Sequence, residues 1–354
     1  MIALVGALAR RELRDLLAPG ARQAESLSGR LTGGGLAGIA WDRWPKWQAG
    51  AGQTEAFETG MTPELARYAA AFGLRPVDVQ GRRVLGLGRG GDNGAWNGRL
   101  AAEIAAYLLR AGEGLAPEAV KKRLPMIGTI AASRLRAADE AASLPGIADE
   151  GPDSVRLEAV TEPYAEYFSV DHLTLRHRLH GGGWSGPLLR AVFMSGDAAV
   201  VLPWDPVRDR VLLIDQMRAG AVARGDGAAW LYEAVAGRVD AGETPEAAAR
   251  REAVEEAGLI VDRLIPGPHH YPSPGAMAEY LYLYVGITDL PDGIEGIGGL
   301  ASEAEDIRSH LMPRAELGRM ALQGRIRNGP LLSLALWLEL SAARIRAELG
   351  QGGR

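Results

Sequence analysis

Runs of hydrophobic residues at strand spacing dominate the second half of the chain. Segments 169–179, 191–205 and 210–220 have a strand-like pattern, and the last two are joined by the turn sequence PVRD. The pattern predicts strands, with a hairpin joining the last two. A further strand is predicted within 278–286, after an intervening helical segment. Strands on both sides of a central helix predict an α/β sandwich.

Helical periodicity marks the regions between and around these strands. Within 61–74, Thr62 is a natural N-cap and Pro63 suits the first helical position. The other segments with helical periodicity are 98–114, 117–142, 313–324 and 329–349. The remainder of the first 75 residues has a weak α/β pattern.

The chain length and the Gly/Pro distribution indicate two domains. With 354 residues, the chain can form two separate cores. A glycine-dense bridge at 81–98 precedes two helices, and the polar, Pro-containing segment 143–154 is the predicted boundary. We therefore expect an N-terminal domain with a helical linker in 1–145 and a second domain in 154–350.

Composition excludes several classes of function. The formal net charge is −5, the isoelectric point is near 5.8, and no Lys/Arg cluster is interleaved with aromatic residues, which argues against nucleic-acid binding. Cysteine is absent, so disulfides, thiolate metal sites and a cysteine nucleophile are excluded. The start of the chain lacks the features of a signal peptide, and the apolar run 330–338 is too short for a membrane span. We expect a soluble, cytoplasmic protein without a membrane partner.

A glycine motif in the first half resembles a dinucleotide-binding loop only superficially. Gly86, Gly88 and Gly91 have the G-x-G-x-x-G spacing, but no helix follows at once and no downstream strand ends in an acid. We interpret this region as a glycine-rich linker. The histidines also form no helical metal-binding pair; they are His172, His177, His180, His269, His270 and His310.

The segment 237–258 places three carboxylates on one helix face. Glu252, Glu255 and Glu256 have i, i+3 and i+4 spacing, where like charges repel. Mg²⁺ prefers oxygen ligands and is commonly held by carboxylates and substrate phosphates, so a bound cation would turn this repulsion into attraction. Gly237 is expected to permit a turn in which the Ala236 carbonyl also faces the metal.

The spacing around this face is that of a known signature. The segment matches G-x5-E-x7-R-E-U-x-E-E-x-G-U, where U is apolar, over its full length. A bare "REAVEEAG" would be interpreted as a solvated helix face, but the complete pattern resembles the Nudix signature. Thr244 and Pro245 are expected to start the helix. Arg250 and Arg251 are expected to relieve the repulsion, and Glu243 and Arg251 to brace the loop against the helix.

Further segments resemble one branch of these proteins. "WLYEAVAGRVDAGET", "SPGAMAE" and "SEAEDIRSHL" are similar to the ADP-ribose pyrophosphatase branch, and more narrowly to its tellurite-resistance-associated relatives. The resemblance implies an α/β/α Nudix sandwich with a mixed sheet, and hydrolysis of ADP-ribose to AMP and ribose 5-phosphate. The alternatives are another sugar nucleotide or dinucleoside polyphosphate as substrate, or a nucleotide sensor without turnover.

The resemblance also implies a role for individual residues. A solvated loop is the alternative for the acid at position 303, and a strand-end charge is the alternative for the arginine at 218. The implied metal ligands are Ala236, Glu252, Glu256 and Glu305; the catalytic residues are Glu303 and Glu255; and the substrate contacts are Arg218, Glu279, Arg190 and Phe168. The implied cation is Mg²⁺, with Mn²⁺ as the alternative, and the implied assembly is a homodimer.

The N-terminal part is similar to a γ-glutamylcyclotransferase-like domain, but departs from its pattern. The tyrosine of the usual Y-G-S/T-L turn is replaced by Val5, and the acid expected after Tyr68 is replaced by Ala69. Without that carboxylate the domain has no evident acid or base. We expect a non-catalytic remnant that serves packing or dimerisation; an unrelated α/β domain is the alternative.

Overall fold

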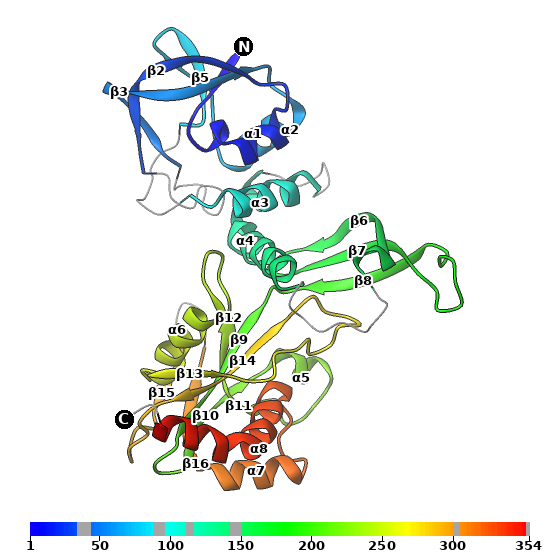
Figure 1. Cartoon of the computed structure of the whole chain (residues 1–354), viewed down its shortest axis with the longest axis vertical. Coiled ribbons are helices and arrows are strands. Elements are labelled where there is room, and N and C mark those ends of the chain that lie inside the picture. Colours follow the sequence, from blue (N-terminus) through cyan, green and yellow to red (C-terminus); the bar gives the residue numbers. More distant parts are fainter. Residues whose placement is uncertain (34–43, 88–95, 111–116, 142–150, 301–304, 352–354) are drawn as a thin grey trace. The chain divides into compact units, whose positions relative to one another are not determined.

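The structure is a computed structural model that describes residues 1–33, 44–87, 96–110, 117–141, 151–300 and 305–351. It divides into two compact units. The first comprises Met1–Gly196 with Asp240–Gly242, and the second Asp197–Val239 with Glu243–Arg354. The class predicted from the sequence is confirmed: an α/β unit in the C-terminal half follows a separate α+β region (Figure 1).

The first unit contains a five-stranded sheet, four helices and a three-stranded sheet. The five-stranded sheet has the order β2-β3-β1-β5-β4, with β1 and β5 parallel. The elements that the structure describes in the first unit are, in chain order, β1 (Ile2–Leu4), η1 (Gly6–Ala9), α1 (Arg11–Leu17), β2 (Arg22–Thr32), β3 (Lys46–Thr59), α2 (Pro63–Ala71), β4 (Val77–Val79), β5 (Arg82–Leu85), α3 (Gly98–Arg110), α4 (Pro117–Glu140), η2 (Pro152–Ser154), β6 (Val155–Ala165), β7 (Ser169–His177) and β8 (Leu188–Met194).

Local chemistry explains where these elements begin and meet. Thr62 accepts a hydrogen bond from Leu65 N at 3.0 Å and Pro63 opens α2, as predicted. A Cβ atom on Gly86 would overlap the carbonyl oxygen of Val5, so this glycine allows the end of β5 to lie against β1. The other two glycines of the dinucleotide-like motif, Gly88 and Gly91, lie outside the described residues.

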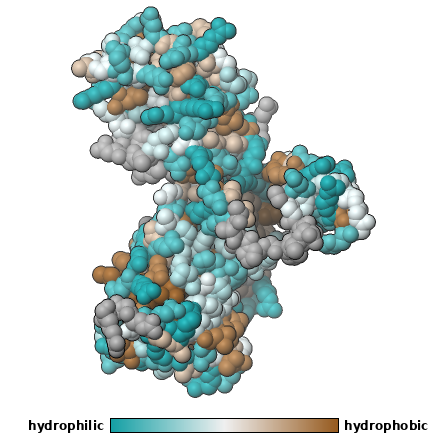
Figure 2. Space-filling view, in the orientation of Figure 1, coloured by the Kyte–Doolittle hydropathy of each residue, from teal (hydrophilic) through white to brown (hydrophobic). Residues whose placement is uncertain are grey.

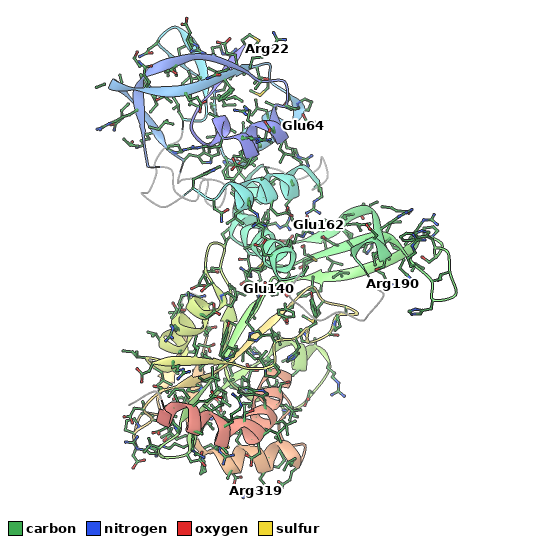
Figure 3. The ribbon with its side chains drawn as sticks, viewed as in Figure 1. Arg22, Glu64, Glu140, Glu162, Arg190 and Arg319 are labelled. Atoms are coloured by element: carbon green, nitrogen blue, oxygen red, sulfur yellow. The ribbon has the colours of Figure 1, made fainter. Side chains whose placement is uncertain are left out.

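The antiparallel sheet β6-β7-β8 is joined to the helices of the first unit by a buried ion pair. Arg123 of α4 donates to both carboxylate oxygens of Glu162 on β6, at 3.1 and 2.8 Å, and Tyr107 of α3 donates to the same carboxylate. Figure 3 labels Glu162. The side chains of Arg123 and Glu162 are only 7% and 9% exposed. Removing either partner would leave a buried charge unpaired, so the pair ties the sheet to the helices.

The second unit is built on an eight-stranded mixed sheet. The main path is β13-β14-β9-β10-β16-β15, with β11 beside β10 and β12 beside β9; β14 and β9 are parallel and the other pairs antiparallel. Its elements are β9 (Ala198–Asp205), β10 (Arg210–Met217), α5 (Ala219–Ala223), β11 (Trp230–Glu233), β12 (Val235–Arg238), α6 (Pro245–Ala257), β13 (Arg263–Pro266), β14 (Leu281–Ile287), β15 (Ile297–Gly298), β16 (Ile307–Pro313), α7 (Arg314–Leu322) and α8 (Gly329–Gln351).

The near-continuous hydrophobic sequence of β9 follows from its burial on both faces. Val200, Leu202 and Trp204 belong to a core that includes α7 and α8, whereas Ala199 and Val201 belong to a core that includes α6. Successive side chains of a strand point to opposite faces, so an apolar run fills both cores at once. The unit is therefore a three-layer α/β/α sandwich with a mixed sheet, as the resemblance implied.

Candidate active site

Helix α6 carries the acidic face and begins and ends at the predicted residues. Thr244 accepts a hydrogen bond from Ala247 N at 3.2 Å, and Pro245 occupies the first turn. Gly258 ends the helix in the left-handed conformation, with φ of 63°. These signals set the register of the helix, and with it the direction of Glu252 and Glu256.

Gly237 lies in strand β12 and not in a turn, which corrects the expected reason for its presence. It has no positive φ, but a Cβ atom at this position would overlap Oε1 of Glu252. The glycine is therefore needed for close approach: it lets the Glu252 carboxylate lie directly against the backbone of β12. Its neighbour Ala236 donates its N–H to Oε2 of Glu256 at 2.9 Å.

The two carboxyl groups that face β12 are largely withdrawn from water. Burial is the main cause that raises the pKa of Glu256 to about 8; the charges of Glu252 and Glu305 act in the same direction, and the Ala236 N–H and Arg218 oppose them. Burial likewise raises the pKa of Glu252 to about 7, against the opposing effect of Arg251. The buried carboxyls therefore favour either protons or a compensating cation near neutral pH.

Arg251 braces the loop and the helix together, as predicted. Its Nε and Nη2 donate to the two carboxylate oxygens of Glu243 at 3.1 and 3.0 Å, and Nη2 also donates to Arg238 O. Its Nη1 donates to Glu252 at 2.5 Å and to Glu255 at 3.0 Å. Arg250 does not relieve the repulsion between the carboxylates, because its guanidinium donates instead to the carbonyl of Val261.

A cavity of about 470 Å³ opens beside β12 and brings several predicted residues together. It is lined by Ala236 and Gly237 on one strand, by Arg218 at the start of α5, and by Glu279 just before β14. This volume is typical of small-molecule sites. Arg218 and Glu279, the implied substrate contacts, thus share one cavity with the strand against which Glu252 lies.

Glu305 lies two residues before the start of β16. Its Oε2 accepts a hydrogen bond from Leu300 N at 3.2 Å, and its charge contributes to the raised pKa of both Glu252 and Glu256. Glu305 is therefore close enough to both carboxyls for its charge to act on them. Glu303, the implied catalytic residue, lies outside the described residues.

Phe168 and Arg190 belong to the first unit and not to the unit that holds the cavity. Phe168 packs between Tyr167 and Phe193, with ring centroids 4.8 Å apart in each case. Arg190 is an exposed residue of β8 whose Nη1 donates to Leu189 O (Figure 3). The predicted metal ligands all belong to the second unit; they are Ala236, Glu252, Glu256 and Glu305.

Sequence reasoning missed three residues that form or support the cavity wall. Glu233, 2% exposed, lines the cavity and binds Arg218 through both carboxylate oxygens. Arg327 and Asn328 line it from the start of α8, where Leu331 N donates to Asn328 Oδ1 at 2.9 Å. An asparagine before a predicted helix is a recognisable N-cap, and it could have signalled this end of α8.

The donor set suits a hard divalent cation, although the side chains are not preassembled. Among the described residues, no three His, Cys, Asp or Glu side chains already form a metal-binding group. Glu252 is instead engaged by Arg251, and Glu256 by Ala236 N. Burial, which raises the pKa of both carboxyls, disfavours their charged forms, and a hard divalent cation such as Mg²⁺ or Mn²⁺ would stabilise those charges with all-oxygen ligation.

A family model and several relatives match the C-terminal part of the chain. The NUDIX domain model matches residues 194–334, which contain the whole acidic helix and the cavity strands. One relative is 41% identical over 198 residues, covering 56% of this chain and 94% of its own length. The chain belongs to the Nudix family.

The relatives are named for different substrates. The 41% identical relative is the ADP-ribose pyrophosphatase of Escherichia coli strain K12. The ADP-ribose pyrophosphatase of Haemophilus influenzae is 36% identical over 185 residues, 52% of this chain and 85% of its own. The GDP-mannose pyrophosphatase of Yersinia pestis is 30% identical over 158 residues, 45% of this chain and 78% of its own.

Proposed function

We propose that this Nudix hydrolase cleaves the diphosphate of ADP-ribose to give AMP and ribose 5-phosphate. The observation that carries the proposal is the cavity in which Arg218 and Glu279 face the strand Ala236–Gly237, with the Glu252 carboxylate directly against that strand. Two relatives named ADP-ribose pyrophosphatase, at 41% and 36% identity, support this substrate.

We propose Mg²⁺ as the cation, held by the Ala236 carbonyl and by Glu252, Glu256 and Glu305. Bound there, Mg²⁺ would neutralise the diphosphate and polarise its phosphorus centres. To bind it, Glu252 must exchange part of its contact with Arg251, which retains Glu243 and Glu255 as partners. Mn²⁺, with similar ligand preferences, is the alternative.

The chain's own residues supply positioning and proton transfer. Arg218, fixed by Glu233, would direct its remaining guanidinium donors at the diphosphate, while Glu279 would orient a ribose hydroxyl. We assign proton removal from the attacking water to Glu303, with Glu255 adjacent to the reacting groups. Water attacks one phosphorus in line, the bond from that phosphorus to the bridging oxygen breaks, and the second phosphate leaves with that oxygen.

A second substrate class is another sugar nucleotide, because a relative at 30% identity is a GDP-mannose pyrophosphatase. A dinucleoside polyphosphate, or binding without turnover, are further alternatives. Purified protein with Mg²⁺ should release AMP from ADP-ribose, with a higher kcat/KM than for GDP-mannose or a diadenosine polyphosphate. Tight binding of ADP-ribose without AMP release would instead make the protein a sensor.

We propose that the chain acts as a homodimer. The sheet β6-β7-β8 exposes Val155, Leu157 and Leu189 by 52%, 57% and 63%, and the surface over these strands has separate hydrophobic areas between hydrophilic ones (Figure 2). Phe168 lies in the connection between β6 and β7, and Arg190 lies on β8; we assign both to the adenosine half of the substrate. Light scattering of the parent and of Leu189→Glu tests the assembly; a monomeric parent contradicts it.

We propose that the N-terminal region is a non-catalytic relative of the γ-glutamylcyclotransferases. Val5 and Ala69 are 0% and 4% exposed, so neither position offers a titratable group. The buried Tyr68 hydroxyl has no hydrogen-bond partner among the described residues, and burial raises its pKa. Absence of cyclotransferase turnover with γ-glutamyl dipeptides is the expected result.

Two further parts of the proposal concern the cell. Among the described helices, none is long and apolar enough to cross a membrane. We propose a cytoplasmic location, for which the absence of cysteine is the support, and fractionation of cells tests it. The resemblance to tellurite-resistance-associated relatives also suggests a link to tellurite tolerance, which growth of a deletion strain on tellurite would test.

A further inference from the structure

Strand β15 (Ile297–Gly298) lies directly on the backbone of α6. Gly298 is the last residue of β15, which pairs with β16 and lies beside α6 (Figure 1). A Cβ atom on Gly298 would overlap the carbonyl oxygen of Glu256. Gly298 has no positive φ, so its conformational freedom is not needed here. The missing side chain matters instead, because it lets the two backbones approach closely.

The contact continues through the next residue. Gly299 N donates to the carbonyl oxygen of Glu255 at 3.2 Å, which satisfies one of the carbonyls that the last turn of α6 leaves unpaired. The carbonyl oxygens of two successive helix residues, Glu255 and Glu256, thus lie against two successive glycines. This arrangement fixes the register between the end of α6 and residues 298–299.

Residues 299 and 300 in turn hold Glu305. Leu300 N donates to Glu305 Oε2 at 3.2 Å, and Glu305 N donates to Leu300 O at 3.3 Å. A Cβ on Gly299 would be 2.8 Å from the Glu305 Cβ, so this approach is also close. A short chain of contacts therefore leads from the backbone of Glu256, through Gly298 to Leu300, to the carboxylate of Glu305.

We propose that Gly298 is a positioning residue: by its contact with the Glu256 backbone, the segment 298–300 sets the distance between the Glu256 and Glu305 carboxylates. The inference rests on the proposed function in that these carboxylates serve together as cation ligands. Mg²⁺ demands near-ideal octahedral geometry, so a displacement of one ligand by a fraction of an ångström weakens its binding. Residues 298–300 are not among the residues that line the cavity, and in this proposal they act through the two glutamates.

The test compares Gly298→Ala with the matched control Gly296→Ala in the full-length protein. Gly296 lies two residues away, also has no positive φ, and would have no heavy atom within 4 Å of an added Cβ. Mn²⁺ binding is measured by water-proton relaxation, alongside the dependence of AMP release on Mg²⁺. For Gly298→Ala we expect Mn²⁺ affinity and kcat each to fall about tenfold or more, because misplaced catalytic groups have effects of this size. Gly296→Ala should match the parent.

A double-mutant cycle with Glu305→Gln separates positioning from general destabilisation. If Gly298→Ala acts by moving Glu305, it should add little further loss of Mn²⁺ affinity in the Glu305→Gln background. Full additivity of the two losses, or parent-like Mn²⁺ affinity in Gly298→Ala, would overturn the inference.

Should Gly298→Ala fail to fold, Leu300→Pro replaces it. This variant deletes the N–H that binds Glu305 and leaves Gly298 in place. Reduced Mn²⁺ affinity supports the inference, and unchanged affinity contradicts it. Because Mn²⁺ binding needs no turnover, a parent that binds Mn²⁺ without releasing AMP would reject the proposed function and leave this comparison intact.

Discussion

Arg218 and Glu233 form a fork-shaped ion pair at the wall of the cavity: Nε lies 3.0 Å from each carboxylate oxygen, and Nη2 2.6 Å from one of them. Glu233 is 2% exposed, whereas the Arg218 side chain is 43% exposed. The buried Glu233 therefore holds Arg218 in place, while the Arg218 guanidinium remains accessible. A fixed, accessible guanidinium suits recognition of a phosphate group.

Arg218→Ala should lower both stability and substrate affinity. It leaves the Glu233 carboxylate buried without its partner, so we expect the melting temperature to fall by on the order of 5 °C. The KM for ADP-ribose should rise about tenfold or more, from loss of a charged hydrogen bond. Adding Glu233→Gln to this variant should restore the melting temperature but not the KM; recovery of both would mean that Arg218 does not touch the substrate.

Glu256→Gln should abolish Mg²⁺-dependent AMP release, because the amide is a weaker, uncharged ligand at the most buried of the proposed positions. Glu246→Gln, on the exposed part of the same helix, is the matched control and should retain parent activity. Turnover is measured over a series of Mg²⁺ concentrations. If the Glu256 variant keeps parent activity, Glu256 is not a ligand.

Glu303→Gln should reduce kcat far more than it reduces cation affinity. Loss of a general base lowers the rate about 10²–10⁴-fold, whereas the proposed ligands remain in place. Single-turnover kinetics and Mn²⁺ relaxation measure the two quantities separately. Asp306→Asn, at a nearby exposed acid, provides the comparison. A loss of Mn²⁺ binding equal to the loss of kcat would reassign Glu303 as a ligand.

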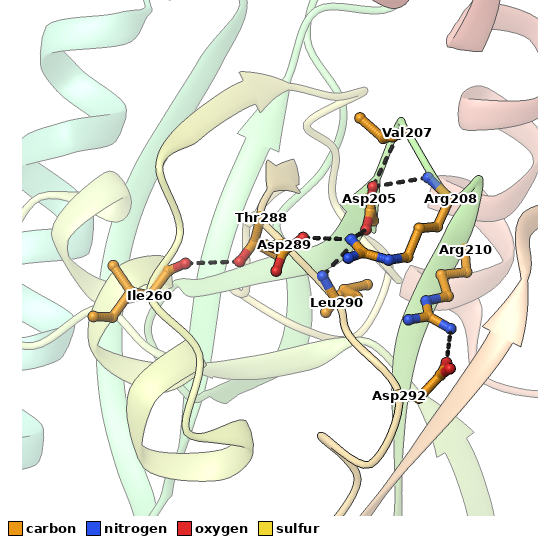
Figure 4. A network of polar contacts seen from close by, with 9 residues as sticks. All are labelled: Asp205, Val207, Arg208, Arg210, Ile260, Thr288, Asp289, Leu290 and Asp292. Atoms are coloured by element: carbon orange, nitrogen blue, oxygen red, sulfur yellow. Dashed lines mark hydrogen bonds and ion pairs between the residues drawn. The ribbon is translucent and has the colours of Figure 1, made fainter.

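Asp205→Asn should destabilise the second unit, and the loss of stability should be larger near neutral pH than in acid. Asp205 is 2% exposed; its carboxylate accepts bonds from the N–H groups of Val207, Arg208 and Leu290 (Figure 4). Burial opposes ionisation, but these bonds and the Arg208 guanidinium outweigh it and lower the pKa of Asp205. The stabilisation is therefore present above the carboxyl's ordinary pKa of 3.8 and is lost as pH falls through the depressed folded value.

Thermal unfolding as a function of pH checks this prediction. In Asp205→Asn the melting temperature should be lower near neutral pH, and its decline with acidity shallower, than in the parent. Asp292→Asn is the control, since Asp292 pairs with Arg210 in the same region but its side chain is 95% exposed (Figure 4). Exposed pairs contribute little, so this variant should behave as the parent. Equal effects in both variants would contradict the role of Asp205.

Sequence patterns predicted strands β9, β10 and β14 and helices α6, α7 and α8 of the second unit, for reasons that are now visible. The doubly buried β9 is a continuous apolar run, and the helix α6 has an N-cap, a first-turn proline and a C-terminal glycine. The long strands β2 and β3 were not recognised, because most of their residues are exposed and small or polar residues interrupt the alternation. Strand β6 was missed for the same reason.

Sequence spacing could place two of the proposed ligands on one helix face, but it could not show the contacts of the cavity. The spacing identified Glu252 and Glu256 because both lie on one helix, where geometry follows from sequence separation. The partner of Arg218 could not be found in this way, since β10 and β11 pair by register across the loop that contains α5. Gly237 was noticed for the wrong reason: a packing requirement from a distant helix leaves no local signal beyond the glycine itself.

The single guanidinium of Arg251 spans Glu243, Glu252, Glu255 and the carbonyl of Arg238. An ammonium group has the same charge but concentrates its donors at one point, so a lysine at this position could not reach both sides of the junction. The breadth of the arginine side chain therefore matters as much as its charge. The Arg251→Lys protein would keep its electrostatic balance and still lose the mechanical coupling between the loop and the helix.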